Sequence, residues 1–215
     1  MISFRLRFLL LFVLACTVLS YYHITASANA ETTICRHQKT TCKGTEEMDV
    51  LIGNKGSNRM NGLGGSDYII GLFGDDYLFG SSGTDTLLGS AGNDVIHGGN
   101  DRDTIMGRTG NDNITGGPGA DEIMGGEGND IILGGNGPDV IIGGEGDDFI
   151  VGGMGADEIS GGKGNDIIYT GNRNSTDSDD AVDVVHCGEG RDEVWLNAGQ
   201  DKDYVAADCE LVHRG

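Results

Sequence analysis

Aspartate recurs at every ninth position through more than half of the chain, in phase with glycine and with an aliphatic side chain. Residues 53–169 form thirteen nine-residue units without a gap, and each unit begins with Gly and carries Met or an aliphatic residue at its eighth position. The sixth position is Asn58 in the first unit and Asp in the other twelve, namely Asp67, Asp76, Asp85, Asp94, Asp103, Asp112, Asp121, Asp130, Asp139, Asp148, Asp157 and Asp166. Carboxylates repeated so strictly provide hard oxygen ligands, and we therefore expect them to bind metal cations.

The spacing of these acids also favours one kind of ion. If the units stack as parallel strands about 4.8 Å apart, adjacent carboxylates repel each other by roughly 1 kcal/mol even in water. Lys and Arg are too few to neutralise them, at 14 against 34 Asp and Glu, and they occupy no fixed place in the unit. Calcium accepts about six to eight oxygen ligands in flexible geometry, whereas magnesium tends to keep its waters. About ten Ca²⁺ ions would roughly offset the formal net charge of −20.

Short strands joined by glycine turns are the elements that can hold these acids in columns. Glycine adopts positive φ without a steric penalty, so each Gly-rich stretch can form a tight turn. Residues such as 130–133 allow only a short strand of about three residues, with the eighth-position side chain facing inward and the seventh facing water. Two units form one coil of about 18 residues, and stacked coils predict an all-β architecture of two narrow parallel sheets.

The unit GGxGxDxUx, seen for example in residues 125–133, resembles the calcium-binding nonapeptide of the RTX, or haemolysin-type, repeat family. The resemblance implies a right-handed parallel β-roll, in which GGxGxD forms the turn and the last three residues form the strand. It also implies that the twelve Asp residues bind calcium between turns two units apart, as in Asp67 with Asp85, together with backbone carbonyl groups. A chain this acidic and rich in Gly should not fold without calcium, so we expect folding and calcium binding to be one event.

The early units depart from this pattern, and so does the unit at residues 98–106. Asp101 stands where the turn requires Gly, and the first five units lack the second Gly of the motif. A non-glycine residue held at positive φ costs on the order of 1 kcal/mol. We therefore expect residues 53–97 and the turn around Asp103 to bind calcium less well than residues 107–169.

Residues 1–30 have the features of an export signal peptide. Two Arg residues precede a short apolar run, and Ala28 and Ala30 provide the small residues of a cleavage site. The run is short for a membrane-spanning helix, which needs about 20 residues, so no membrane span is expected after cleavage. A lipid anchor at Cys16 is the alternative. The protein is predicted to be extracellular or attached to the cell surface.

Cleavage of the signal would leave four Cys, an even number that suits an oxidising compartment. We expect the local disulfides Cys35–Cys42 and Cys187–Cys209, one at each end of the mature chain. The alternative for the first pair is a metal site in which His37 joins Cys35 and Cys42. This site would have only three candidate ligands, fewer than the four of a structural zinc site, and the compartment is oxidising. We therefore favour the disulfide.

The segments on either side of the repeats are predicted to cap the ends of the roll. Residues 31–52 would form a small N-terminal cap, and residues 170–215 would form a C-terminal cap. Two degenerate units are visible in the second cap, with Asp183 and Asp192 at their sixth positions. Trp195, the only Trp of the chain, is expected in the core of this cap.

The composition favours a calcium-dependent structural or surface-interaction protein over an enzyme. An acidic chain repels phosphate groups, which disfavours nucleic acid as a partner. The flanking segments are too short for a catalytic domain, the His residues are far apart, and no nucleophile motif is present. Components of a cell envelope or an extracellular matrix are the expected partners. The alternatives are an accessory module of a secreted enzyme or toxin system, and an ice-binding solenoid, for which a single Thr at the third position, Thr109, is too few.

Overall fold

The computed structural model describes residues 31–34, 40–171, 181–196 and 203–214. The predicted signal peptide at residues 1–30 lies outside the described residues, as do Cys35 and His37. The regular structure in the described ranges is entirely β-strand. These ranges therefore contain no helix that could cross a membrane.

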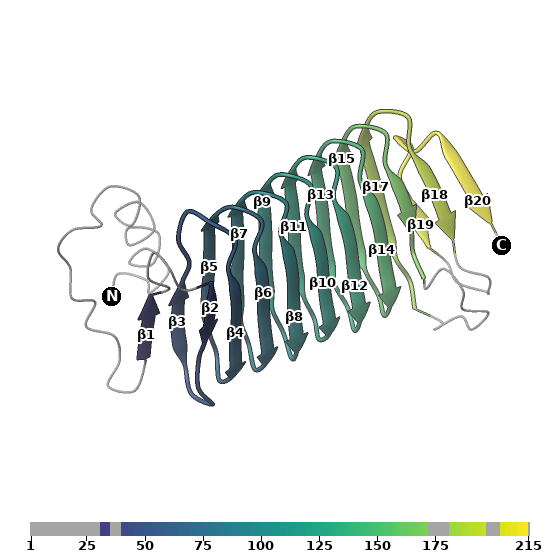
Figure 1. Ribbon diagram of the computed structural model, residues 1–215. Coiled ribbons are helices and arrows are strands. Elements are labelled where there is room, and N and C mark those ends of the chain that lie inside the picture. The colour runs from purple at the N-terminus through teal and green to yellow at the C-terminus, as the bar shows by residue number, and fades with distance from the viewer. Residues whose placement is uncertain (1–30, 35–39, 172–180, 197–202, 215) are drawn as a thin grey trace, which may run out of the picture.

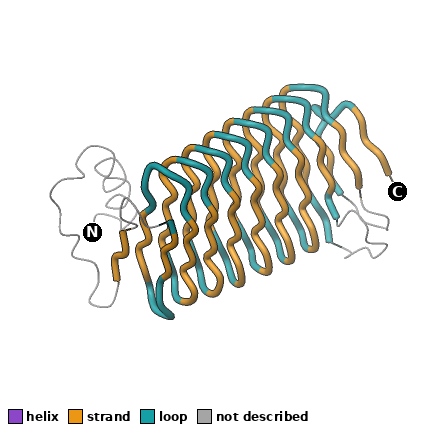
Figure 2. Tube along the Cα trace, viewed as in Figure 1, coloured by secondary structure: helices purple, strands orange, loops and turns teal. Residues whose placement is uncertain are grey.

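Two parallel sheets of ten strands each run along the length of the molecule (Figure 1). The first sheet contains β1 (Glu31–Ile34), β3 (Asp49–Ile52), β5 (Tyr68–Phe73), β7 (Thr86–Ala91), β9 (Thr104–Thr109), β11 (Glu122–Glu127), β13 (Val140–Glu145), β15 (Glu158–Lys163), β17 (Val184–Glu189) and β19 (Tyr204–Val205). The second sheet contains β2 (Thr41–Lys43), β4 (Arg59–Gly64), β6 (Tyr77–Ser82), β8 (Val95–Asn100), β10 (Asn113–Pro118), β12 (Ile131–Asn136), β14 (Phe149–Met154), β16 (Ile167–Tyr169), β18 (Glu193–Leu196) and β20 (Leu211–Arg214). Figure 2 shows the loops that carry the chain from one sheet to the other, so that the chain winds as a solenoid.

Each strand pairs in parallel with the strand two places further along the chain. Ile132, for example, lies opposite Ile114 in one neighbouring strand and opposite Ile150 in the other. Hydrogen bonds between successive turns carry the same 18-residue interval. The structure therefore confirms the all-β parallel roll that was predicted from two nine-residue units per coil.

The core consists of two ladders of eighth-position side chains, one from each sheet. These side chains are no more than 1% exposed. They are Met60, Ile69, Leu78, Leu87, Ile96, Ile105, Ile114, Ile123, Ile132, Ile141, Ile150, Ile159 and Ile168. Seventh-position side chains face outward as predicted, and Ile131 is 45% exposed. Each buried side chain contributes about 2 kcal/mol of hydrophobic stabilisation. Most units bury only this one, and Leu88 and Val151 are buried in addition.

The strands are longer than the sequence predicts. Most contain six residues rather than three, because pairing resumes after the first glycine of the following unit. Between β12 and β14 the ladder contains the pairs Leu133–Val151 and Gly135–Gly153, and it leaves out Gly134. The glycine therefore interrupts the ladder for one residue instead of ending the strand.

The two sheets continue through the segments that were predicted as caps. Strands β1 to β3 extend the roll at one end, and β17 to β20 extend it at the other. Val185 and Val194 prolong the core ladders and are fully buried. The predicted Cys187–Cys209 disulfide is present, with a Cα–Cα distance of 5.1 Å. Cys42 is also disulfide-bonded, and its predicted partner lies outside the described residues.

Trp195 does not lie in the core, and the prediction for it is wrong. Its side chain is 38% exposed on the outer face of β18. It stacks between Tyr169 and His213, with ring centroids 5.9 Å and 3.9 Å away. Successive side chains of a strand point to opposite faces, and the preceding Val194 points inward. The alternation of the strand, rather than the size of the indole, therefore decides where Trp195 lies.

Candidate metal centre

The sixth-position side chains form two columns, one for the turns that precede each sheet. The first column, before the strands of the first sheet, contains Asp49, Asp67, Asp85, Asp103, Asp121, Asp139, Asp157 and Asp183. The second column, before the strands of the second sheet, contains Asn58, Asp76, Asp94, Asp112, Asp130, Asp148, Asp166 and Asp192. All of these side chains are at most 2% exposed. The twelve Asp residues predicted from the sequence thus divide equally between two buried rows.

One oxygen of each carboxylate links consecutive coils. The backbone N–H of Asp112 donates to Asp130 Oδ1 at 2.8 Å, and the N–H of Asp130 donates to Asp148 Oδ1 at 2.8 Å. The same bond recurs along both columns with N–O distances of 2.6–2.9 Å. Bonds from an N–H to an ionised acceptor are stronger than neutral ones. Oδ1 therefore helps to fix the register of the roll.

The other oxygen, Oδ2, lacks a hydrogen-bond donor within the described residues along most of both columns. The Asp residues concerned are Asp67, Asp76, Asp85, Asp94, Asp103, Asp112, Asp121, Asp130, Asp139, Asp148, Asp166 and Asp192. A buried acceptor without a partner costs about 1–3 kcal/mol, and more when it is charged. A whole row of such atoms requires either protons or cations.

The glycine at the first position of each unit opens the space that these oxygens face. A Cβ atom on Gly134 would lie 2.6 Å from Asp139 Oδ2 and 2.5 Å from the carbonyl oxygen of Gly152 in the next coil. The corresponding two oxygens surround the first-position glycines Gly125 and Gly143. A carboxylate and a carbonyl oxygen therefore converge where no side chain stands. Two acceptors without a donor between them suit a hard cation.

The backbone would have to supply many of the remaining ligands. Across the part of the chain that the structure describes, no three side chains of His, Cys, Asp and Glu gather into a cluster that could hold a metal ion. Each column offers carboxylate oxygens from neighbouring coils and carbonyl groups of the glycine turns, all of them hard donors. This set fits Ca²⁺, whereas zinc prefers thiolate and imidazole ligands.

Burial raises the pKa of acids in both columns, Asp130, Asp139 and Asp148 among them. Loss of hydration is the largest cause, and it raises the pKa from 3.8 to about 6 for Asp130 and to about 7 for Asp139 and Asp148. The hydrogen bond from the backbone N–H one coil earlier lowers each pKa. For Asp148 the carboxylates of Asp130 and Asp166 raise the pKa again. Without metal, the columns therefore retain protons near pH 6, and a cation must displace them.

We expect protonation of the columns at acidic pH to stabilise the metal-free roll, in part as bound calcium would. The pKa of these carboxyl groups is about 3.8 in the unfolded chain and about 6 to 7 in the metal-free roll. Between these pH values the folded roll therefore binds more protons than the unfolded chain. Its stability should therefore be highest at the acidic end and should fall as pH rises through about 7. Circular dichroism in EDTA should show more β structure at about pH 5 than at about pH 7.5. Equal or greater β content at the higher pH would contradict this, provided that sedimentation excludes aggregation near the pI of 4.3.

The sequence signature of these turns matches the model of a known protein family. That model describes the RTX calcium-binding nonapeptide repeat, and it matches residues 43–78, 79–114, 97–132, 106–141, 124–159 and 133–168. The chain belongs to the RTX calcium-binding nonapeptide-repeat family. No curated protein matches the chain.

The RTX columns extend beyond the thirteen units that the sequence shows clearly. Asp49 opens the first column, in a unit that begins at Gly44 and buries Leu51 at its eighth position. The missing fourth-position Gly hides this unit, although its other three signature residues are in phase. At the opposite end, Asp183 and Asp192 continue the columns across an interval of 26 residues instead of 18.

The early RTX units hold non-glycine residues in a glycine conformation. Leu63, Leu72, Ser81 and Ser90 stand at the second position with φ of 83–89°. Asp101, at the fourth position of its unit, has φ of 74°. Each costs on the order of 1 kcal/mol, which confirms the strain predicted at Asp101. Arg108 has the same conformation at the second position of its unit, with φ of 87°, so this strain also reaches the stretch from residue 107 that was predicted to bind calcium better.

An exposed ladder of Asn and Asp side chains runs beside the second column. It consists of the fifth-position residues Asp75, Asn93, Asn111, Asn129, Asp147 and Asn165. Each Oδ1 accepts the backbone N–H of the next member, as in Asn129 N–H to Asn111 Oδ1 at 2.8 Å. Beside the first column, the fifth positions are mostly Ser, Thr, Ala and Pro. The ladder thus stabilises one set of RTX turns through its own hydrogen bonds.

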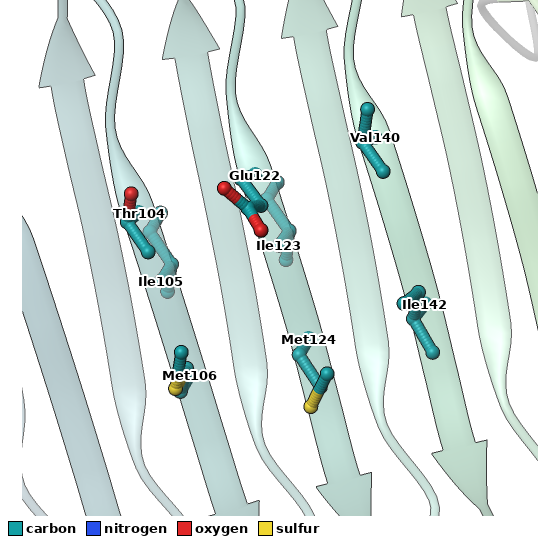
Figure 3. Close-up of a pocket in the computed structure, with 8 residues that line it drawn as sticks. All are labelled: Thr104, Ile105, Met106, Glu122, Ile123, Met124, Val140 and Ile142. Atoms are coloured by element: carbon teal, nitrogen blue, oxygen red, sulfur yellow. The ribbon is translucent and has the colours of Figure 1, made fainter. Parts of the chain in front are cut away.

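The outer face of the first sheet carries a shallow apolar hollow. Met106, Met124 and Ile142 lie in register on β9, β11 and β13. Figure 3 shows them on the near side of the strands, with Ile105 and Ile123 behind on the core side. Met124 is 42% exposed and Ile142 is 37% exposed. This RTX roll therefore offers apolar contact area on a flat face, apart from its acid columns.

Proposed function

We propose that this protein is a secreted RTX roll that folds on binding several Ca²⁺ ions and has a structural or surface-interaction role outside the cell. The observation that carries the proposal is the row of buried Oδ2 atoms without hydrogen-bond donors, each facing the space beside a glycine. Membership of the RTX family supports calcium as the ion. About ten ions would roughly offset the formal net charge of −20.

The protein's own residues prepare each site. Oδ1 of a sixth-position residue holds two coils in register, and Oδ2 stays available together with the carbonyl oxygen of a first-position residue. The first-position glycine leaves room between these oxygens. Bound Ca²⁺ supplies the positive charge that turns repulsion between stacked carboxylates into attraction. The free energy of binding therefore becomes free energy of folding.

The surroundings of the columns support an extracellular and non-enzymatic role. The Cys187–Cys209 disulfide suits an oxidising compartment. His97, His186 and His213 lie on three different strands, β8, β17 and β20, and the last two strands belong to opposite sheets. The apolar hollow on the first sheet is the surface that we propose for contact with a cell-envelope or matrix component.

The adjacent residues Asp147 and Asp148 allow a matched test of the columns. Asp148 is buried in the second column, whereas Asp147 belongs to the exposed fifth-position ladder, where other coils carry Asn. The substitutions Asp148→Asn and Asp147→Asn remove the same charge, and both keep an Oδ1 atom for the backbone hydrogen bond. We expect Asp148→Asn to raise the calcium concentration at the folding midpoint by roughly threefold to tenfold, because ligand charge sets affinity.

Isothermal titration calorimetry and circular dichroism of both variants would measure this difference, with magnesium in place of calcium as the ion control. Asp147→Asn should behave like the unsubstituted protein in both measurements. Equal midpoints for the two variants would show that the columns are not calcium sites. An equal response to magnesium would argue against calcium as the ion that the columns select.

A further inference from the structure

The outer face of the second sheet carries no formal charge across its middle strands. The strands β6, β8, β10, β12, β14 and β16 contain no Asp, Glu, Lys or Arg, although these residues make up 22% of the whole chain. In the first sheet, by contrast, every strand from β9 to β17 carries at least one charged residue, such as Glu122 and Glu158. The two outer faces of the roll therefore differ in charge, and the second can meet another neutral surface without repulsion.

The same strands have the composition of strands that are buried on both faces. Their central residues are apolar on both sides, as in residues 131–133, Ile-Ile-Leu, and residues 167–169, Ile-Ile-Tyr. Parallel sheets normally have both faces covered, and continuous apolar runs of this kind mark their strands. Ile132 faces the core, whereas Ile131 and Leu133 are 45% and 39% exposed on the outer face. The outward side chains thus suit a second layer that would cover them.

A single charge of opposite sign stands at each end of this uncharged stretch. β4 contributes Arg59 and β18 contributes Glu193, each the only charged residue of its strand. Both occupy the seventh position and belong to one row of outward side chains that crosses the sheet in register. Arg59 is exposed, and Glu193 is 34% exposed with Oε1 2.8 Å from His213 Nε2. The row is therefore positive at one end and negative at the other.

A second copy of the same face is the partner that fits these charges. If the second copy is turned by half a revolution about an axis parallel to the strands, midway between β10 and β12, its strands follow in the reverse order. β4 then lies over β18 of the second copy, and Arg59 of each copy faces Glu193 of the other. A twofold axis along the roll would instead bring like charges together at each end, which disfavours that arrangement. Twofold contacts between identical surfaces are the commonest kind in soluble oligomers.

The area of the face is close to what a stable dimer needs. The eight strands from β4 to β18 are about 4.8 Å apart and span roughly 35 Å along the roll. Most of them have six residues, which at about 3.3 Å each give a width of about 20 Å. The face thus measures about 700 Å², against about 800 Å² per partner in a standard interface. We therefore expect a reversible dimer with a dissociation constant in the micromolar range.

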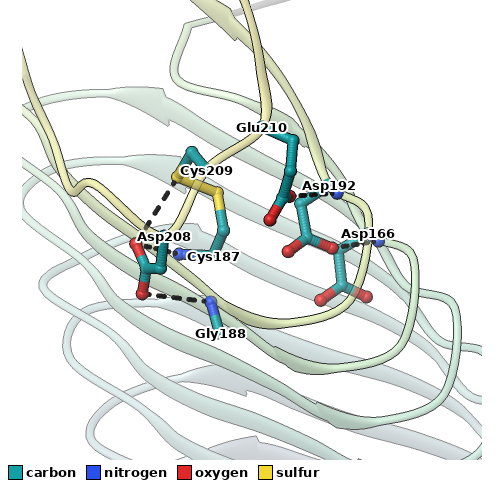
Figure 4. Close-up of a disulfide and its surroundings, with 7 residues drawn as sticks. All are labelled: Asp166, Cys187, Gly188, Asp192, Asp208, Cys209 and Glu210. Atoms are coloured by element: carbon teal, nitrogen blue, oxygen red, sulfur yellow. Dashed lines mark hydrogen bonds between the residues drawn. A yellow bond between two sulfur atoms is a disulfide. The ribbon is translucent and has the colours of Figure 1, made fainter.

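The ends of the roll offer less to a second copy than this face does. In Figure 4 the last turn of the second column is covered from within the chain, because Glu210 Oε2 accepts the backbone N–H of Asp192 at 2.9 Å beside the Cys187–Cys209 disulfide. The terminal strands β1, β2, β19 and β20 have only two to four residues. Short edge strands disfavour pairing between the sheets of two copies. Association through the outer face is therefore favoured over end-to-end growth.

We propose that the calcium-loaded protein forms a twofold dimer through the outer face of its second sheet, with Arg59 of each copy opposite Glu193 of the other. This inference goes beyond the proposed function, because it assigns a partner to a face that the calcium columns do not use. The apolar hollow of the first sheet lies on the opposite side of the roll. It therefore stays exposed on both copies and remains available to a component of the cell surface.

The test is sedimentation velocity of the calcium-saturated protein at several concentrations, with charge reversals at both ends of the face. We expect Arg59→Glu and Glu193→Arg each to raise the dissociation constant by roughly tenfold, because either change places two pairs of like charges in contact. The double variant restores both pairs with exchanged signs, so its dissociation constant should return to within about threefold. Glu158→Arg, at an exposed seventh position of the first sheet, changes the net charge as Glu193→Arg does and should leave the dimer unchanged.

A second pair of variants tests the apolar part of the face. Leu133 on the second sheet and Ile142 on the first sheet have nearly equal exposed fractions, 39% and 37%. Leu133→Glu should raise the dissociation constant by roughly a hundredfold, because it places a charge without a partner near the centre of the interface. Ile142→Glu should leave it unchanged.

Far-ultraviolet circular dichroism at saturating calcium checks that each variant is folded. A protein that folds with calcium but sediments as a monomer at every concentration would overturn the dimer and leave the proposed function intact. Equal weakening by Glu158→Arg or Ile142→Glu would overturn the choice of the second sheet. A double variant that dimerises no better than the single reversals would overturn the pairing of Arg59 with Glu193.

Discussion

Removing calcium at neutral pH should abolish most of the β-sheet signal of this protein, and restoring calcium should recover it in one cooperative transition. The two acid columns are the reason. Their carboxylates stack at about 4.8 Å, where each neighbouring pair repels by roughly 1 kcal/mol in water and several kcal/mol in a drier environment. The core offers little to offset this repulsion, since most units bury only one aliphatic side chain.

The measurement is far-ultraviolet circular dichroism in EDTA, followed by titration with calcium and, separately, with magnesium. We expect the calcium midpoint to fall at about 10⁻⁴–10⁻³ M, the range of extracellular calcium modules. Magnesium should give a smaller response at the same concentration, because it gives up its waters reluctantly. A full β-sheet spectrum in EDTA at neutral pH would contradict the coupling of folding to metal. Sodium chloride at matched ionic strength controls for simple screening.

Substituting one interior glycine should destabilise the roll although only a methyl group is added. At Gly134 the new Cβ atom would lie 2.5 Å from the backbone oxygen of Gly152 and 2.6 Å from Asp139 Oδ2. The backbone oxygen cannot rotate away, so the coils must separate or the calcium ligands must shift. Overpacking of this kind costs about 1–3 kcal/mol, and Gly134→Ala should also weaken calcium binding at the adjacent turn.

Gly56 provides the matched control for this substitution. A Cβ atom there would meet only Asn54 Oδ1, at 3.7 Å, which is an ordinary contact. Urea unfolding at saturating calcium should therefore give a lower midpoint for Gly134→Ala and a nearly unchanged midpoint for Gly56→Ala. Identical unfolding curves for the two variants would show that the first-position glycines are not needed for close approach of the coils.

The sequence by itself determines the repeated part of this protein. A period of nine fixes which side chains stack, because every coil contains the same number of residues and each position returns to the same place. Ile132 must then face Ile114 and Ile150, and Asp130 must stand in line with Asp112 and Asp148. The fold, the core ladder and the twelve stacked Asp residues follow from that period alone.

The tertiary structure decides what happens where the period fails. Asp183 and Asp192 rejoin the columns after an interval of 26 residues, and Glu210 takes the place of an Asp in a segment without any repeat. The sequence shows Asp183 and Asp192 at the sixth positions of two degenerate units, but it shows neither which coil they join nor the place of Glu210, because an insertion changes the spacing along the chain while the sheets still pair in space. Trp195 is outside because it follows the inward-facing Val194 in β18, and Tyr169 and His213 are its neighbours in register on the two adjacent strands. Local pattern fixes stacking within the repeats, and only pairing through space fixes how the ends are closed.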